Sequence, residues 1–243
     1  MARSAHVLEG EPELSRVRKI LKPLRVRLRK RRHALFLALI DDLPRPLRIL
    51  DVGGSQRFWE TMEYVARADV EITLLNRSRV KVRHPGFEFV PGDARDMKRF
   101  ADREFDVVFS NSVIEHVGEF DDQQRMAEEV RRVGKRYFLQ TPNRFFPIEP
   151  HFFFPLFQFL PLSVRVLLLM NLPLTHRGRI RERARAVEAA SEIRLLSRAE
   201  LQKLFPGATM QHERFMGLTK SFVLFHGFKV TQVLSRFPER ASR

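Results

Sequence analysis

Residues 48–55, with the sequence RILDVGGS, constrain the fold of this chain more than any other stretch. They are typical of a short apolar strand that ends in Asp51 and runs into two glycines, and residues 58–68 after them are typical of a helix. A strand, a glycine turn and a helix in this order form the half-unit with which doubly wound α/β proteins hold a nucleotide. Because Ser55 and Arg57 stand where a dinucleotide fingerprint has glycine, the stretch alone does not decide the ligand.

Further apolar runs predict the rest of a parallel sheet. They cover residues 47–52, 70–75, 87–90, 105–110 and 137–140. A helix is predicted over residues 121–133, because acids stand at its start and arginines at its end. Strands that alternate with helices at this spacing predict a parallel sheet covered on both faces.

The end of the chain predicts a different arrangement. Ser197 and Glu200 form a capping box for a helix that runs through Phe205. The runs 209–215 and 221–228, joined by residues 216–219, are typical of an antiparallel hairpin. The predicted fold class is therefore α/β, with a Rossmann-like doubly wound sheet of about seven strands, mostly parallel and with a C-terminal antiparallel hairpin.

Composition excludes some chemistry and raises one question. With 243 residues the default is one domain with appendages, and with no cysteine the chain has no disulfide, thiolate metal site or cysteine nucleophile. The formal net charge is +15, and ten basic residues with no acid among them lie between Arg16 and Arg32. Such a charge suggests a polyanionic partner, which is nucleic acid or an anionic membrane.

The basic stretch itself predicts an amphipathic helix. Apolar residues 17, 20, 21, 24 and 28 fall at helical spacing, Pro23 predicts a kink or restart, and a second helix is expected over residues 33–43. The stripe either packs on the domain or faces lipid or RNA. Residues 1–14 are polar and expected to be unstructured. Because no secretory signal is visible, we expect a cytoplasmic protein, with peripheral membrane association as an alternative.

Residues 145–174 are aromatic and aliphatic but interrupted by five prolines. A transmembrane helix needs about 20 uninterrupted apolar residues, so short helices that cap the sheet are predicted instead. They suit a lid over an apolar substrate, a dimer contact or a membrane contact. The predicted division is a basic helical extension over residues 1–43, a main domain over residues 44–230 with a helical cap at about 145–195, and a tail over residues 231–243.

Four stretches together carry a family resemblance: ILDVGGS, FVPGDARDM, FDVVFSNSVIEHV and YFLQTPN. Each follows or ends a predicted strand, and between residues 47 and 228 the chain resembles the class I S-adenosylmethionine-dependent methyltransferases, in their small-molecule branch. The resemblance implies a methyltransferase with S-adenosyl-L-methionine as its cofactor. It places the cofactor-binding residues at the carboxyl ends of the strands: Asp51, Gly53, Gly54, Ser55, Asn76, Asp93, Ala94 and Asn111.

The resemblance also suggests a role for each of these positions. Asp51 would take the ammonium group of the cofactor, and Asn76 would bind the ribose hydroxyls where the family usually has Asp or Glu. Asp93 and the N–H of Ala94 would read adenine, and Asn111 would lie beside the methionine arm. The altered glycine loop and Asn76 put cofactor affinity in question.

Methyl transfer is an in-line displacement, and an oxygen nucleophile of high pKa benefits from a general base. The candidates are His116, Glu149 and His151, with His151 preferred and Glu149 as its partner. His116, in the sequence Glu115-His116, has a purely structural alternative. No metal site is expected, because the histidines lack the spacing of a zinc site.

These residues predict methyl transfer to an oxygen of a small or lipid-linked acceptor, such as a sugar, a lipid or a polyketide-like molecule. An RNA ribose methyltransferase stays open because of the basic helix. A non-catalytic protein that binds anionic membrane on a methyltransferase fold is the third hypothesis.

Overall fold

The computed structural model describes residues 13–62, 69–148, 151–152, 154–175 and 178–237. The chain divides into two compact units, one made of Met1–Arg29 with Ile148–Ala190 and the other of Lys30–Pro147 with Ser191–Arg243. The second is called the sheet unit below, and the first the cap unit. The predicted domain division stays a prediction, and residues 30–43 belong to the sheet unit.

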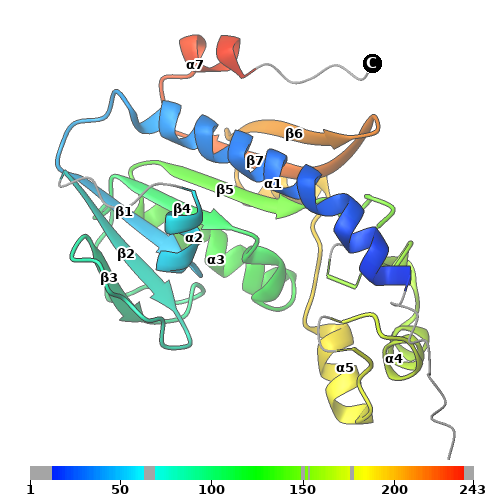
Figure 1. The fold of residues 1–243 in the computed structure, drawn as a ribbon. Coiled ribbons are helices and arrows are strands. Elements are labelled where there is room, and N and C mark those ends of the chain that lie inside the picture. Colours follow the sequence, from blue (N-terminus) through cyan, green and yellow to red (C-terminus); the bar gives the residue numbers. More distant parts are fainter. Residues whose placement is uncertain (1–12, 63–68, 149–150, 153, 176–177, 238–243) are drawn as a thin grey trace, which may run out of the picture. The chain divides into compact units, whose positions relative to one another are not determined.

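The sheet unit contains one seven-stranded sheet with the strand order β3-β2-β1-β4-β5-β7-β6 (Figure 1). The first five strands are parallel neighbours, β7 is antiparallel to β5, and β6 is antiparallel to β7. The predicted fold class is therefore confirmed. The strand bounds are β1 (Leu47–Val52), β2 (Val70–Asn76), β3 (Phe87–Pro91), β4 (Val107–Asn111), β5 (Tyr137–Pro142), β6 (Thr209–Phe215) and β7 (Leu218–His226).

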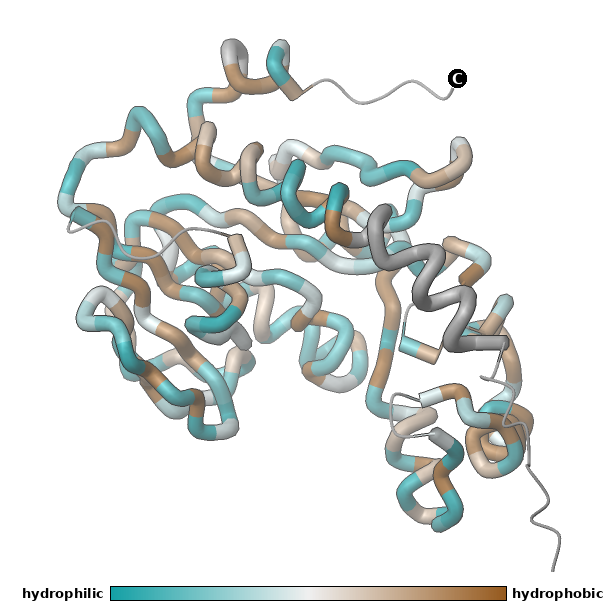
Figure 2. Tube along the Cα trace, viewed as in Figure 1, coloured by the Kyte–Doolittle hydropathy of each residue, from teal (hydrophilic) through white to brown (hydrophobic). Residues whose placement is uncertain are grey.

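Helices cover both faces of this sheet. Successive side chains of a strand point to opposite faces, so each strand contributes to two cores. Leu50 and Val52 of β1 pack in a core with α3 (Phe120–Val133) and α6 (Arg198–Leu204). Ile49 packs in the opposite core with α1 (Glu13–Ile40) and α2 (Gln56–Thr61). Figure 1 shows α3 behind the sheet and α2 in front, and in Figure 2 the strands are hydrophobic between polar ends.

The N-terminal helix differs from its prediction. α1 runs without a break from Glu13 to Ile40, so Pro23 does not divide it. A proline inside a helix removes one backbone hydrogen bond, and the many leucines, arginines and lysines around it favour the helix. The helix also ends in the sheet unit, where Leu35, Phe36 and Ile40 are fully or almost fully buried.

Other boundaries shift by a few residues. The helix α2 begins at Gln56, and part of its predicted range, residues 63–68, lies outside the described residues. The strand β4 begins at Val107, two residues later than predicted. The strand β7 begins at Leu218, so the hairpin turn is only Met216 and Gly217. Both have positive φ, 48° and 80°, as a type I′ turn requires.

The capping box of Ser197 and Glu200 is confirmed, with both hydrogen bonds formed. Where a tail was predicted, residues Thr231–Arg236 form the short helix α7, and Val233 and Leu234 pack against the core. The predicted tail residues 238–243 lie outside the described residues, as do residues 1–12 of the segment 1–14 that was predicted to be unstructured. The prediction is wrong at Glu13 and Leu14, which begin α1.

The cap unit contains η2 (Phe157–Phe159), α4 (Leu162–Asn171) and most of α5 (Arg183–Ser191). Its own small core includes Phe157 and Leu169, with Phe152 against Phe157 at a ring-centroid distance of 4.4 Å. No helix in the described part of the chain is long and apolar enough to cross a membrane.

Candidate functional site

A pocket of about 250 Å³ opens at the carboxyl ends of β1, β2, β3 and β4. In open α/β sheets this edge is where ligands bind. Four of the predicted cofactor residues line the pocket: Gly53, Asn76, Asp93 and Ala94. The predicted residues Asp51, Gly54, Ser55 and Asn111 are not among its lining residues. The other lining residues are Val52, Leu75, Arg77, Gly92, Arg95, Ser112, Val113, His116 and Val117.

The two residues after β1 must be glycine, because neighbouring side chains lie where their Cβ atoms would be. Gly53 has φ +74°, and a Cβ there would lie 2.6 Å from Cγ2 of Val113 on the pocket wall. A Cβ at Gly54 would collide with the carboxylate of Asp51. Neither position has room for a side chain. Ser55, the residue before α2, stands where the dinucleotide fingerprint has a further glycine.

Asp51 is buried at the end of β1, with 1% of its surface exposed. Its Oδ2 accepts a hydrogen bond of 2.7 Å from Nε1 of Trp59 on α2. Burial raises the pKa of Asp51 to about 8, although the bond from Trp59 acts to lower it. The sequence analysis did not predict this bond.

Asn76, at the end of β2, connects two strand ends. Its Nδ2 donates to the carbonyl oxygen of Gly54 at 3.4 Å, and its Oδ1 accepts from the N–H of Ser78 at 3.4 Å. A carboxamide both donates and accepts, which an aspartate or glutamate at this position would not do. The next residue, Arg77, also lines the pocket and is exposed.

Asp93, after β3, is clamped by Arg95. The Nε and Nη2 atoms of Arg95 lie 2.9 and 2.6 Å from the two carboxylate oxygens, and the Arg95 N–H adds a bond of 2.9 Å. These hydrogen bonds lower the pKa of Asp93, against the opposing effect of its partial burial. Nη1 of Arg95 also donates to Asp122 and to the carbonyl of Val117. Sequence reasoning missed Arg95, which fixes the pocket wall.

Asn111, at the end of β4, is held by a cation that the sequence analysis placed in the basic run. Nη1 of Arg32, on α1, donates to Oδ1 of Asn111 and, at 2.7 Å, to Oε1 of Gln140. The same guanidinium pairs with Glu213 on β6 at 3.0 and 2.7 Å. Arginine has no acceptor, so the carbonyl of Asn111 must face Arg32 and its NH₂ group must face away.

Glu213 also accepts a hydrogen bond from the hydroxyl of Ser221. Burial acts to raise the pKa of Glu213, but the charge of Arg32 and the bonds from Arg32 and Ser221 outweigh it and lower the pKa. Both members of the Arg32–Glu213 pair have side chains only 10% exposed. The pair therefore keeps its charges in the interior of the sheet unit.

The predicted base candidates separate into three cases. His116 lines the pocket, and its Nδ1 lies 4.0 Å from Glu192. Its neighbour Glu115 is fully buried and accepts a hydrogen bond of 3.0 Å from Thr141 of β5, which is a structural role. Glu149 lies outside the described residues, and His151 belongs to the cap unit. Their roles stay predictions.

Comparison with known proteins adds a family match. Residues 50–137 match the family model described as a methyltransferase domain. An uncharacterised protein of Mycobacterium tuberculosis is 39% identical to this chain over 67 residues, which are 28% of this chain and 23% of that protein. The match thus spans about a quarter of the relative's length.

Solved structures of methyltransferases are also similar. An S-adenosylmethionine-dependent methyltransferase of Methanosarcina mazei shares 17% identity and a TM-score of 0.44, with 73% of this chain and 90% of that chain covered. One of Aquifex aeolicus shares 14% identity and a TM-score of 0.44, with coverage of 89% and 98%. Every residue that lines the pocket lies within residues 50–137, the segment that matches the methyltransferase-domain model.

Proposed function

We propose that this chain transfers a methyl group from S-adenosylmethionine, bound at the pocket, to an oxygen of a small or lipid-linked acceptor. The observation that carries the proposal is the pocket at the ends of β1 to β4, with Gly53, Asn76, Asp93 and Ala94 on its walls. Sugars, lipids and polyketide-like molecules are the acceptor classes that we favour.

The pocket walls suit the adenosine half of the cofactor. Leu75, Val113 and Val117 supply apolar surface for a flat base, and Asn76 supplies a donor and an acceptor for a diol. Asp93 keeps its negative charge because of Arg95, so it is an acceptor for an exocyclic amino group.

Two side chains near the same strand ends have chemistry that suits the methionine half of the cofactor. Asp51, once ionised, would balance an ammonium group, and the NH₂ group of Asn111 would donate to a carboxylate. When bound, S-adenosylmethionine supplies an electrophilic methyl carbon. The chain's own part is to align the acceptor and exclude water, and a base would take the acceptor proton. His116, on the pocket wall, and His151 with Glu149 are the candidates.

Calorimetric titration with S-adenosylhomocysteine tests the cofactor site. We expect micromolar binding by the full chain, a loss of about tenfold or more in Asn76→Ala and in Asp93→Asn, and no change in Lys98→Gln, whose side chain is 87% exposed. Absence of binding by the unaltered chain would favour the non-catalytic hypothesis.

The acceptor and the base need a second experiment. Transfer of labelled methyl from S-adenosylmethionine to a panel of sugar, lipid and polyketide-like acceptors would identify the acceptor class. Comparing the pH profiles of kcat for His116→Gln and His151→Gln would then identify the base, because only the loss of the base removes a protonation step from the profile.

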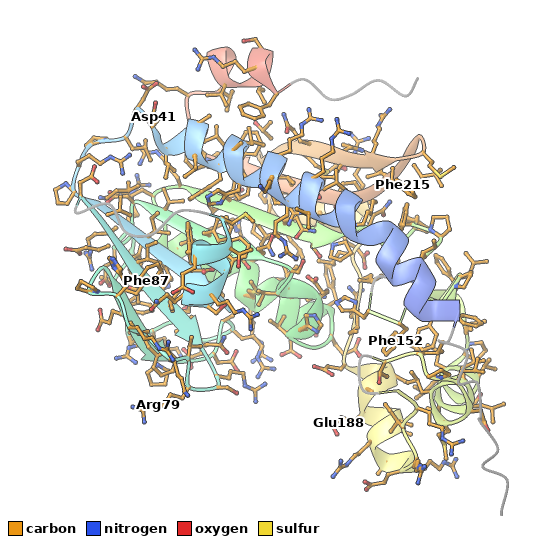
Figure 3. All side chains as sticks on the ribbon, in the orientation of Figure 1. Asp41, Arg79, Phe87, Phe152, Glu188 and Phe215 are labelled. Carbon is orange, nitrogen blue, oxygen red and sulfur yellow. The ribbon has the colours of Figure 1, made fainter. Side chains whose placement is uncertain are left out.

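RNA remains a second candidate acceptor because of a basic loop beside the pocket. Arg77, Arg79, Lys81 and Arg83 follow β2, all are exposed, and no acid lies among them. Figure 3 shows Arg79 extending away from the sheet. Methylation of an RNA ribose predicts binding that weakens steeply as salt is added, whereas a neutral acceptor predicts little dependence on salt.

A further inference from the structure

Most of the large hydrophobic residues that are exposed in the described chain lie in the cap unit. Of the eleven large hydrophobic residues that are exposed in the described chain, seven lie between residues 148 and 190. They are Leu156, Phe159, Leu162, Val164, Leu167, Leu172 and Val187. A contiguous exposed apolar patch on a protein marks a site that binds a membrane or another molecule.

The helix α4 carries apolar residues on its exposed side as well as on its buried side. Val166 and Leu169 are 7% and 0% exposed and face the core of the cap unit, whereas Val164 and Leu167 are 38% and 61% exposed. The exposed pair, like the buried one, is three residues apart, so each pair forms its own stripe along the helix. A surface helix normally turns polar residues outward. In Figure 2, α4 is hydrophobic over most of its length.

Arginines lie directly beside this helix. The N–H of Ile180 donates to the carbonyl of Leu169 at 2.9 Å, which places residues 179–181 against the end of α4. Arg179 and Arg181 flank Ile180, and Arg183 and Arg185 follow on α5; all four are exposed. Of these four arginines, Arg185 pairs with Glu182 at 2.9 Å. The one arginine within α4, Arg165, instead donates to the carbonyl of Ala190 inside the unit.

We propose that the cap unit docks on an anionic lipid bilayer. Val164 and Leu167 enter the boundary between head groups and acyl chains, and Arg179, Arg181 and Arg183 bind lipid phosphates. Apolar side chains beside cations are the composition of interfacial helices. An RNA would use the arginines but leave the apolar stripe in water, so lipid fits both observations better. The inference is independent of the proposed catalytic activity.

Co-sedimentation of the full chain with vesicles tests this surface. We expect binding to vesicles of phosphatidylcholine with phosphatidylglycerol, and much weaker binding to phosphatidylcholine alone. The double variant Val164→Asp/Leu167→Asp should lose about 10- to 100-fold in affinity, because two apolar side chains that insert into the bilayer are replaced by anions. The matched control Met216→Asp alters a residue that is 84% exposed on the sheet unit, and it should bind as the unaltered chain does.

Circular dichroism and S-adenosylhomocysteine affinity identify variants that have lost their fold rather than the membrane contact. Equal vesicle binding by the double variant and the unaltered chain would overturn the proposal. So would salt-sensitive RNA binding without vesicle binding, or a dimer that the double variant converts to a monomer without vesicle binding.

Fluorescence gives a readout of insertion that does not depend on affinity. The only tryptophan, Trp59, is fully buried in the sheet unit, so its emission should not respond to vesicles. In Leu167→Trp we expect a blue shift when anionic vesicles are added. An unchanged emission maximum in the sedimented complex would show that α4 does not enter the bilayer. In Arg181→Gln/Arg183→Gln the blue shift should require more anionic lipid.

Discussion

The guanidinium of Arg32, on α1, and the carboxylate of Glu213, on β6, form a two-armed ion pair at 3.0 and 2.7 Å. Both side chains are 10% exposed. The pair connects the N-terminal helix to the far edge of the sheet, and through Asn111 and Gln140 it also reaches the ends of β4 and β5. The last residue of the basic run is therefore part of the domain interior.

Breaking this pair should destabilise the protein strongly. Arg32→Met leaves the carboxylate of Glu213 buried without its counter-charge, which costs about 3–5 kcal/mol of unfolding free energy. The matched control is Arg27→Met on the same helix, where the side chain is exposed and a change within about 0.5 kcal/mol is expected. Urea denaturation measures both. Equal unfolding midpoints for the two variants would contradict the structural role of the pair.

Gly54→Ala should lower both stability and cofactor affinity. The added methyl group collides with the carboxylate of Asp51, and overpacking of a rigid interior costs about 1–3 kcal/mol. Ser55→Ala is the control for stability, since the hydroxyl of Ser55 makes no cap hydrogen bond with α2. Thermal unfolding and calorimetric titration with S-adenosylhomocysteine would show the difference. A stable Gly54→Ala variant with unchanged affinity would contradict the close contact between position 54 and the carboxylate of Asp51.

Asp51 should make stability depend on pH in an unusual direction. Its pKa is raised from 3.8 to about 8 by burial, so between these pH values the folded state holds a proton that the unfolded state releases. The unfolding free energy should therefore fall as the pH rises through this window. Burial lowers the pKa of His33 from 6.5 to about 4, which has the opposite effect between those values.

Asp51→Asn separates the two contributions, because His33 acts equally in both proteins. The stability of Asp51→Asn relative to the unaltered chain should increase from pH 4 to pH 8, as measured by urea denaturation. Its affinity for S-adenosylhomocysteine should decrease, because the amide carries no charge for the ammonium group. A stability difference that is independent of pH would show that Asp51 titrates normally.

Arg95→Gln should weaken ligand binding by about tenfold while changing stability little. Without Arg95 the carboxylate of Asp93 loses its two-armed hydrogen bonds, so it is free to turn from the pocket and its pKa rises toward the ordinary range. Calorimetry with S-adenosylhomocysteine measures the effect, with Lys98→Gln as the exposed control. Tighter binding by Arg95→Gln would mean that Arg95 competes with the ligand for Asp93.

Met216→Asn should stabilise the hairpin of β6 and β7. Met216 has φ +48° and is 84% exposed, and asparagine adopts this left-handed conformation at lower cost. The unfolding free energy should rise by about 0.5–1 kcal/mol. Met216→Val is the opposite control, since a β-branched residue disfavours positive φ. If both variants unfold at the same temperature, backbone strain at this turn is negligible.

Local patterns in the sequence were enough to predict the sheet. The bounds of β1 and β6 were predicted to the residue, because buried parallel strands and alternating strands have distinct apolar patterns. The capping box at Ser197 was equally clear, since both of its hydrogen bonds are local. The pocket residues Gly53, Asn76, Asp93 and Ala94 were predicted from the resemblance to the methyltransferase family, which places cofactor-binding residues at strand ends.

The partners of those residues depended on the tertiary structure. Arg32 falls four residues after Leu28 and three before Leu35, on the same helical stripe, and this spacing was the available sign that it turns inward. The positive charge of Arg32 argued against an inward position, because an arginine is stable in the interior only beside an oppositely charged group. Glu213 supplies it from 181 residues away. Trp59, eight residues after Asp51, donates a hydrogen bond to that carboxylate, and Arg95, two residues after Asp93, pairs with it. Which strand ends carry the polar groups is a property of the sequence, whereas their charges and orientations are decided by contacts that exist only after folding.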